Sequence, residues 1–304
     1  MQYPPNKIPA EYGREFITNP TRVQRQLESL TRGYNIADFV FAPGDANNGG
    51  VVYDRVTPTN AGDRLNRTAE ERAPGTEFTQ IDVSDAAPKY DVAKEYGAEI
   101  EIPMRTITRS ENRAIARYVE HLADAVIRKI DTIAMDTIAR DQDVHTYGID
   151  TPWNNSAADP IGDVLMARGM AEDNPTDNPA LAYTINTAVI NPADLRKYLW
   201  ANKDIREELT KATEVPSPIV NPYFEGYLDL SWVPSNRVKP GELWLIDRDK
   251  AGALGDEDNG LQVDMWEEKK RRVQVNQAWR SVVPYITDPG AIIRVTGFGA
   301  QSGN

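Results

Sequence analysis

The sequence predicts an α+β protein with an extended body, and three features of the chain support this class. A short alternating strand at 98–104 runs directly into a very long helix at 108–141. A compact strand–helix–strand–strand unit follows at about 180–255, and long strands return after residue 260. Helices and strands segregated along the chain in this way are typical of α+β architectures.

The composition indicates a soluble globular protein made in the cytoplasm. The chain has 304 residues, of which 40% are hydrophobic, so it is long enough for one large domain or two ordinary ones. It has no cysteine, and its only histidines are His121 and His145. We therefore expect no thiol chemistry and no transition-metal site. The composition leaves carboxylate-oxygen sites open, and our overall expectation is no metal and no cofactor. No apolar run approaches the roughly 18 residues of a membrane span, and the N-terminus lacks a signal-peptide segment.

The charge of the chain argues against a dedicated nucleic-acid-binding protein. The formal net charge is −12, whereas binding to phosphates requires a net basic surface.

Residues 1 to 41 mix turn signals with one short amphipathic piece. Val23, Leu27 and Leu30 share a helical face behind Thr21, which is a candidate N-cap. This pattern fits a surface helix and a docking arm equally well.

Residues 42 to 98 contain too few large apolar side chains to fill a core. Only eight of these 57 positions are Ile, Leu, Val, Phe, Met or Trp. The segment is therefore either disordered or a long β-hairpin ordered by packing on another chain. The strand-like patches "GGVVYDRV" and "EFTQIDVS" favour the hairpin.

The strand and long helix that follow are predicted from their periodicity. Ile100 and Ile102 alternate with glutamates before Pro103, which predicts a half-buried strand. Thr108 and Glu111 have the spacing of a capping box, which predicts the start of the helix. One apolar stripe then runs along it: Ile115, Val119, Leu122, Val126, Ile130, Ile133 and Ile138. No Gly or Pro interrupts it before Gly148, so we expect a buried stripe under a rod of about 50 Å.

The last part of the chain predicts long strands that complete the sheet begun at 98–104. Within it, "EEKKRR" would alternate its charges between the two faces of a strand. We interpret these residues as a paired-charge surface at a subunit contact: Glu267, Glu268, Lys269, Lys270, Arg271 and Arg272.

We find no motif that indicates an enzyme. The phosphate-binding, nucleophile-elbow and zinc-helix motifs are all missing from the sequence. The acidic segment from Asp256 to Glu267 has partial calcium-loop spacing, but Gly260 falls one position early and no helix frames it. A solvated acidic turn fits this segment better.

The order of these parts resembles the major capsid proteins of tailed phages, which have the Hong Kong-97 type fold. The segments "KYDVAKEYGAEIEIPMRTITRSEN" and "VINPADLRKYL" look like the family's entry into its spine helix and its early axial-domain helix. The resemblance divides the chain as follows: N-terminal arm 1–41; E-loop 42–97; peripheral domain 98–160, with spine helix 108–141; axial domain 161–259; peripheral return strands and C-terminus 260–304.

The resemblance implies a structural protein rather than an enzyme. It implies assembly into the pentamers and hexamers of an icosahedral phage head that encloses double-stranded DNA, built in the host cytoplasm. Expected partners are a separate scaffolding protein, a portal and a decoration protein. Arg22, Arg25 and Arg32 would face the interior and contact DNA weakly, without sequence preference.

Two alternatives remain open from the sequence. An encapsulin-type nanocompartment shell would share this fold but belong to a cell. A carboxylate-dependent enzyme belongs to a different class, and no pair among the 46 acidic residues identifies one.

Overall fold

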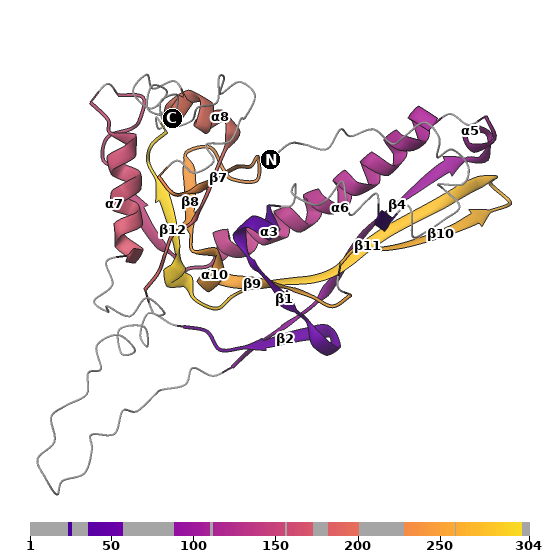
Figure 1. The fold of residues 1–304 in the computed structure, drawn as a ribbon, viewed down its shortest axis with the longest axis horizontal. Coiled ribbons are helices and arrows are strands. Elements are labelled where there is room, and N and C mark those ends of the chain that lie inside the picture. Colours follow the sequence, from indigo (N-terminus) through magenta and orange to yellow (C-terminus); the bar gives the residue numbers. More distant parts are fainter. Residues whose placement is uncertain are drawn as a thin grey trace, which may run out of the picture.

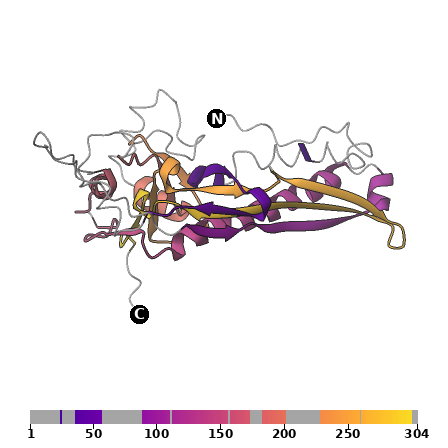
Figure 2. The same cartoon turned by 90° about the horizontal axis from the view of Figure 1, so that it is seen from below.

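The computed structural model describes residues 24–25, 36–56, 88–109, 112–155, 157–172, 182–200, 228–258 and 260–299. These residues form two sheets, a two-stranded ribbon and one long helix that runs from the first sheet to the second (Figure 1), so the predicted mixture of helices and strands is confirmed. Seen edge-on, the elements form a thin, elongated body (Figure 2). In chain order they are α3 Ala37–Val40, β1 Ala42–Asp45, η2 Asn47–Gly49, β2 Gly50–Tyr53, β3 Lys89–Val92, β4 Lys94–Pro103, α5 Met104–Thr108, α6 Asn112–Arg140, β5 His145–Gly148, α7 Pro160–Glu172, β6 Thr187–Ile190, α8 Pro192–Asp194, η3 Leu195–Trp200, β7 Ser231–Pro234, β8 Glu242–Ile246, α10 Arg248–Ala251, β9 Gly252–Asp256, β10 Gln262–Glu268, β11 Val273–Ile286, η4 Pro289–Ala291 and β12 Ile292–Thr296.

The first sheet is organised around β11, a strand of 14 residues. Strand β11 pairs antiparallel with β4 along one edge, and with β10 and then β9 along the other. Strand β1 extends the sheet beside β9 in parallel. In the β4–β11 ladder Ile100 lies opposite Asn276. This confirms the prediction that a late strand completes the sheet begun at 98–104.

Helix α6 packs along this sheet and contributes much of its core. It has 29 residues, which corresponds to a length of about 44 Å. Six of the seven side chains in the predicted stripe are at most 3% exposed: Ile115, Val119, Leu122, Val126, Ile130 and Ile138. Ile133, predicted in the same stripe, is only half-buried, and Ala134 is fully buried instead. Ala134 lies four residues after Ile130, which is the spacing that keeps a side chain on the same helical face.

The start of the long helix differs from the sequence prediction. Thr108 is the last residue of the separate short helix α5, and α6 begins at Asn112. The Thr108 hydroxyl donates a hydrogen bond to the Met104 carbonyl at 2.7 Å, one turn earlier. The prediction that Thr108 is the N-cap of α6 was therefore wrong, because the Thr108 hydroxyl forms its hydrogen bond within α5. Glu111, the other half of the predicted capping box, lies outside the described residues.

The second sheet has the strand order β5-β12-β8-β6-β7 and is covered on both faces. Alternate residues of the central strand β8 point to opposite sides. Leu243 and Leu245 pack in the core shared with α7, whereas Trp244 and Ile246 join the core shared with α6. Burial on both faces explains the nearly continuous apolar runs of β6, β8 and β12.

Strand pairing does not follow the boundaries predicted from the sequence. β12 lies in the second sheet, although it falls in the predicted return segment 260–304. β9 pairs with β11 in the first sheet, although it falls in the predicted axial segment 161–259. β1 and β5 are displaced from their predicted segments in the same way. These pairings join residues far apart in sequence, so local patterns did not reveal them.

Asp131 is a buried carboxylate in α6, with 5% of its surface exposed. Its Oδ1 accepts the amide hydrogen of Ala37, at the start of α3, at 3.2 Å. Burial raises the pKa of Asp131 to about 6, although hydrogen bonds from the Ala37 and Ile36 amides oppose the rise. Asp131 therefore fixes the segment that enters β1 against the long helix.

Leu122→Asp should prevent folding, because it places an unpaired charge under α6. An unpaired charge in a core costs about 3–5 kcal/mol. This is a large part of the total stability of a domain, which is about 5–15 kcal/mol. The matched control is Ala125→Asp, at an exposed position of the same helix. Soluble yield and circular dichroism are the measurements. Equal yields and spectra for both variants would show that the stripe is not buried.

Asp131→Asn should change how stability depends on pH. Since the folded state raises the pKa of Asp131, its contribution to stability is complete below about pH 4 and is lost as pH rises through about 6. The difference in unfolding free energy, Asp131→Asn minus wild type, should therefore increase by on the order of 1–3 kcal/mol as pH rises from about 4 to about 6. Above that pH the difference should stay constant. Denaturant unfolding from pH 4 to 8 measures this. Asp136→Asn, at an exposed position of α6, is the control, and a constant offset between Asp131→Asn and wild type would contradict the account.

Candidate functional site

The β2–β3 ribbon branches from the first sheet and uses one face to pack on it (Figure 1). Val51 and Tyr53 of this inner face contact Val283 and Tyr285 of β11. The Tyr53 and Tyr285 rings lie 4.8 Å apart between centroids. The Tyr53 hydroxyl donates a hydrogen bond to the Asp91 carboxylate at 2.7 Å, and burial, with this bond, raises the pKa of Tyr53. The base of the ribbon is therefore fixed to the body.

The outer face of the ribbon carries apolar side chains that face solvent. Val52, Tyr90 and Val92 are 68%, 60% and 53% exposed. Val52 lies directly opposite Tyr90 in the ladder, and Val92 lies opposite Gly50, so the three side chains share one face. A Cβ at Gly50 would lie 2.7 Å from the Tyr90 hydroxyl, so glycine makes room for the ring. Clustered exposed apolar side chains of this kind mark interaction surfaces.

An ion-pair clamp holds the chain where it leaves β2. Arg55 Nη2 donates hydrogen bonds to Asp141 at 2.6 Å and to Asp143 at 2.7 Å. The Arg55 side chain is 10% exposed and that of Asp141 is 7% exposed. Asp141 directly follows α6, where the helix dipole disfavours a negative charge, and Arg55 compensates for it. The Val56 amide also donates to the Thr287 carbonyl at 2.8 Å.

The charged segment from Glu267 to Arg272 lies at the end of the body that is far from α7 (Figure 1). Only its two glutamates belong to β10, while Lys269–Arg272 form the turn into β11. The prediction of strand-like alternation was therefore wrong for the four basic residues, because the antiparallel β10–β11 pair needs a turn there. Arg271 pairs with Glu101 of β4 at 2.6 Å. A subunit contact at this turn remains a prediction.

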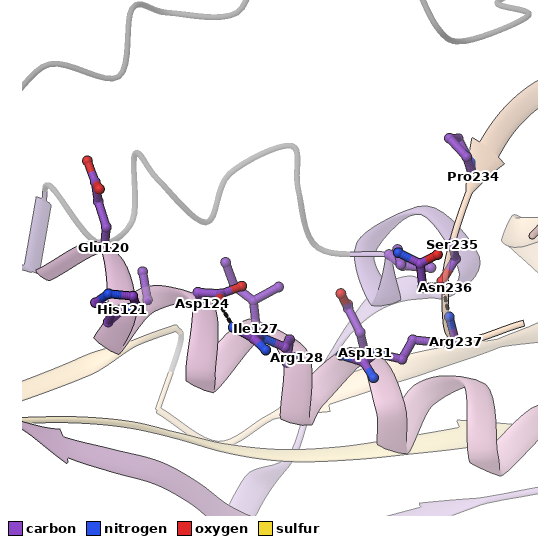
Figure 3. Close-up of a pocket in the computed structure, with 12 residues that line it drawn as sticks. Glu120, His121, Asp124, Ile127, Arg128, Asp131, Pro234, Ser235, Asn236 and Arg237 are labelled. Atoms are coloured by element: carbon purple, nitrogen blue, oxygen red, sulfur yellow. Dashed lines mark hydrogen bonds and ion pairs between the residues drawn. The ribbon is translucent and has the colours of Figure 1, made fainter. Parts of the chain in front are cut away.

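The outward face of α6 lines an open pocket of about 690 Å³ (Figure 3). Glu120, His121 and Asp124 line it from the helix, and Asn236 and Arg237 line it from the loop after β7. His121 is exposed, as an isolated surface histidine would be. An Asp124–Arg128 ion pair crosses one turn of the helix. This is a solvated charged face, and it brings no nucleophile–base pair together.

The remaining sequence predictions for sites fall at other places in the molecule. Arg25 is exposed beside Gln24, whose side chain donates to the Leu261 carbonyl at 3.0 Å, whereas Arg22 and Arg32 lie outside the described residues. In the segment with partial calcium-loop spacing, Asp256 pairs with Arg280 at 2.7 Å and Asp258 accepts a hydrogen bond from Ser281 at 2.9 Å. Each of these two carboxylates is therefore bonded to a side chain of the protein itself. Among the described residues, no group of three His, Asp or Glu side chains could hold a metal ion. None of the described helices has the length and apolarity of a membrane span.

Sequence reasoning did not identify Arg55, Asp141, Asp143 or Asp131. Arg55 and Asp141 are separated by 86 residues and meet only in the folded chain. The one local signal is the pair of aspartates directly after the long helix, which is an unfavourable place for negative charge and so indicates a cationic partner.

Comparisons with known proteins give a consistent result. A family model described as phage capsid protein matches residues 86–295. No curated protein sequence matches the chain.

Solved structures show the same fold. A phage-related protein from Bordetella bronchiseptica is 14% identical and aligns with a TM-score of 0.62, over 91% of this chain and 97% of its own. The virus-like particle from Pyrococcus furiosus is 10% identical, with a TM-score of 0.59 over 94% and 99%. The capsid of cyanophage P-SCSP1u is 10% identical, with a TM-score of 0.53 over 84% and 85%.

These likenesses confirm the predicted Hong Kong-97 type fold. Since the family model covers more than half of its length, the chain belongs to the phage capsid protein family, whose members are structural proteins of the virion.

Proposed function

We propose that this capsid protein forms the pentamers and hexamers of an icosahedral phage head that encloses double-stranded DNA. The observation that carries the proposal is the outer face of the β2–β3 ribbon. Val52, Tyr90 and Val92 are exposed there on a base that is fixed to the body. In a member of the phage capsid family, a neighbouring subunit is the natural partner for this face.

The mechanism of assembly that we propose is mechanical. Helix α6 and the first sheet make a stiff body. We call β2, β3 and the chain between them (residues 50–92) the arm, and the clamp at Arg55 sets the direction in which it extends from the body. An arm that reaches a different surface of the next subunit makes a heterologous contact, and repeating that contact around an axis closes a ring. We assign the spine role to α6, the E-loop role to the chain between β2 and β3, and the axial role to the second sheet.

Electrostatics and partners complete the proposal. With a net charge of −12, the chain would hold packaged DNA only weakly, since each fixed cation adds a salt-dependent phosphate contact. Arg22, Arg25 and Arg32 would supply weak contacts of this kind. A separate scaffolding protein, a portal and a decoration protein would act with it in the host cytoplasm. The proposal includes no catalytic role.

The direct test is gel filtration and negative-stain microscopy of the purified chain. Closed shells that form as concentration rises are expected. A monomer that persists at all concentrations, both alone and with the scaffolding protein present, would contradict the proposal.

A second candidate is the shell of a cellular nanocompartment. The observation that favours it is the similarity, with a TM-score of 0.59, to a virus-like particle that comes from a cellular organism, Pyrococcus furiosus. Particles purified from the native source distinguish the two functions. Nuclease-protected DNA would support the phage head, and an enclosed protein cargo would support the compartment.

Shortening the arm should separate folding from assembly. Replacing 58–86 with a short Gly-Ser linker keeps β2, β3 and Arg55, and Tyr53 pairs with Lys89 where the linker would close the hairpin. We expect a folded, soluble subunit that forms no stable shell. Circular dichroism checks the fold and electron microscopy checks assembly. Normal shells would count against the arm as an assembly element.

Removing the clamp should weaken the base of the arm. Arg55→Met leaves Asp141 buried without its partner, which costs on the order of 3–5 kcal/mol of unfolding free energy. The matched control is Arg140→Met, whose ion pair with Asp136 is exposed, and which should cost less than about 1 kcal/mol. Denaturant unfolding compares the two variants. Equal losses would show that the Arg55 ion pairs behave as surface pairs.

A further inference from the structure

Helix α7 has apolar side chains on two opposite faces. Its inner face packs in the core of the second sheet, where Val164 and Ala167 are at most 1% exposed. On the outer face Leu165, Met166 and Met170 are 46%, 66% and 49% exposed. A helix that is apolar all round is typical of a helix covered on both sides.

The charged side chains of α7 are all used within the same subunit. Asp163 accepts a hydrogen bond from the Trp153 indole at 2.8 Å. Arg168 donates to Glu172 at 2.7 Å and to the Leu228 carbonyl at 2.9 Å. Asp, Arg and Glu occur once each in this helix, and the Arg168 and Glu172 side chains are 20% and 28% exposed, so the most exposed side chains of the helix are the apolar ones.

We propose that the outer face of α7 docks a second copy of this chain. The inference rests on the proposed function and names one contact surface of the shell. Two copies that each have a net charge of −12 repel, so a close contact between them is favoured where acidic side chains are either absent or paired with basic ones. The outer face of α7 meets the first condition at Leu165, Met166 and Met170, whose exposed side chains are all apolar.

The two methionines give this face a further property. Met side chains are unbranched and flexible, and they adapt to partners of different shape. Met166 and Met170 lie one turn apart on the exposed side. One α7 face could therefore contact a neighbour in both a pentamer and a hexamer, where the angle between subunits differs.

Cysteine labelling tests the contact directly, because the natural chain has no cysteine. In Met166→Cys, the rate of reaction with a maleimide should fall at least tenfold when isolated subunits assemble. Equal rates in the two states would overturn the proposal. A slow rate already in the isolated subunit would also overturn it, since the subunit's own chain would then cover the face.

A charge on the same face should block assembly without unfolding the subunit. Met166→Glu should raise the concentration needed for assembly at least tenfold and leave the thermal unfolding temperature of the isolated subunit unchanged. Met166→Leu is the matched control and should assemble as wild type does. Unimpaired assembly of Met166→Glu would overturn the role of α7 and leave the shell function intact. A wild-type chain that never assembles would overturn both.

Discussion

The packing on the two faces of β11 is the constraint on which the rest of the structure depends. Ala278, Val282 and Ile286 face the core beneath α6, while Val283 and Tyr285 face the arm. Because side chains alternate along a strand, one strand supports the long helix on one side and the arm on the other. A shift of one residue in its pairing would exchange the two sets of side chains, so its register fixes both elements at once.

Buried charged side chains lie at two places where a segment of the chain is attached to this body. Asp131 holds the start of α3 against α6, and Arg55 holds the start of the arm against Asp141 at the end of the same helix. Burying charge is expensive, and well-packed apolar residues often give equal or greater stability. A directional bond, however, fixes the angle at which a segment leaves the body. For a subunit whose arm must reach a neighbour, we infer that these two buried interactions orient the segments that they attach to the body.

Local patterns in the sequence were enough to predict the parts of the fold that repeat regularly. The spacing of Ile115, Val119 and Leu122 predicts a helix, and the alternation of Ile100 and Ile102 predicts a half-buried strand. Both signals arise from one element and one buried face. The scarcity of apolar residues at 42–98 likewise predicts a segment that cannot form its own core.

The errors occur where a competing local bond or a residue distant in sequence decides the structure. The Thr108 hydroxyl had a competing acceptor one turn earlier, and β12 joins the second sheet through pairing with β5 and β8. The Arg55–Asp141 pair connects residues that no local window contains. The sequence pattern did not predict the exposed apolar face of α7 for a different reason. A helix that is apolar on both faces has no clear amphipathic period, so the pattern does not indicate which face is exposed.

The central claim is that a subunit with a stiff body completes its arm contacts only on a neighbour. Hydrogen–deuterium exchange of isolated subunits and assembled particles tests this most directly. Amides of α6 and β11 should exchange slowly in both states, and those of β2 and β3, which pair with each other in the isolated subunit, should become markedly more protected on assembly. Equal exchange of the ribbon amides in the two states would contradict the claim, as would rapid exchange of α6 in the isolated subunit.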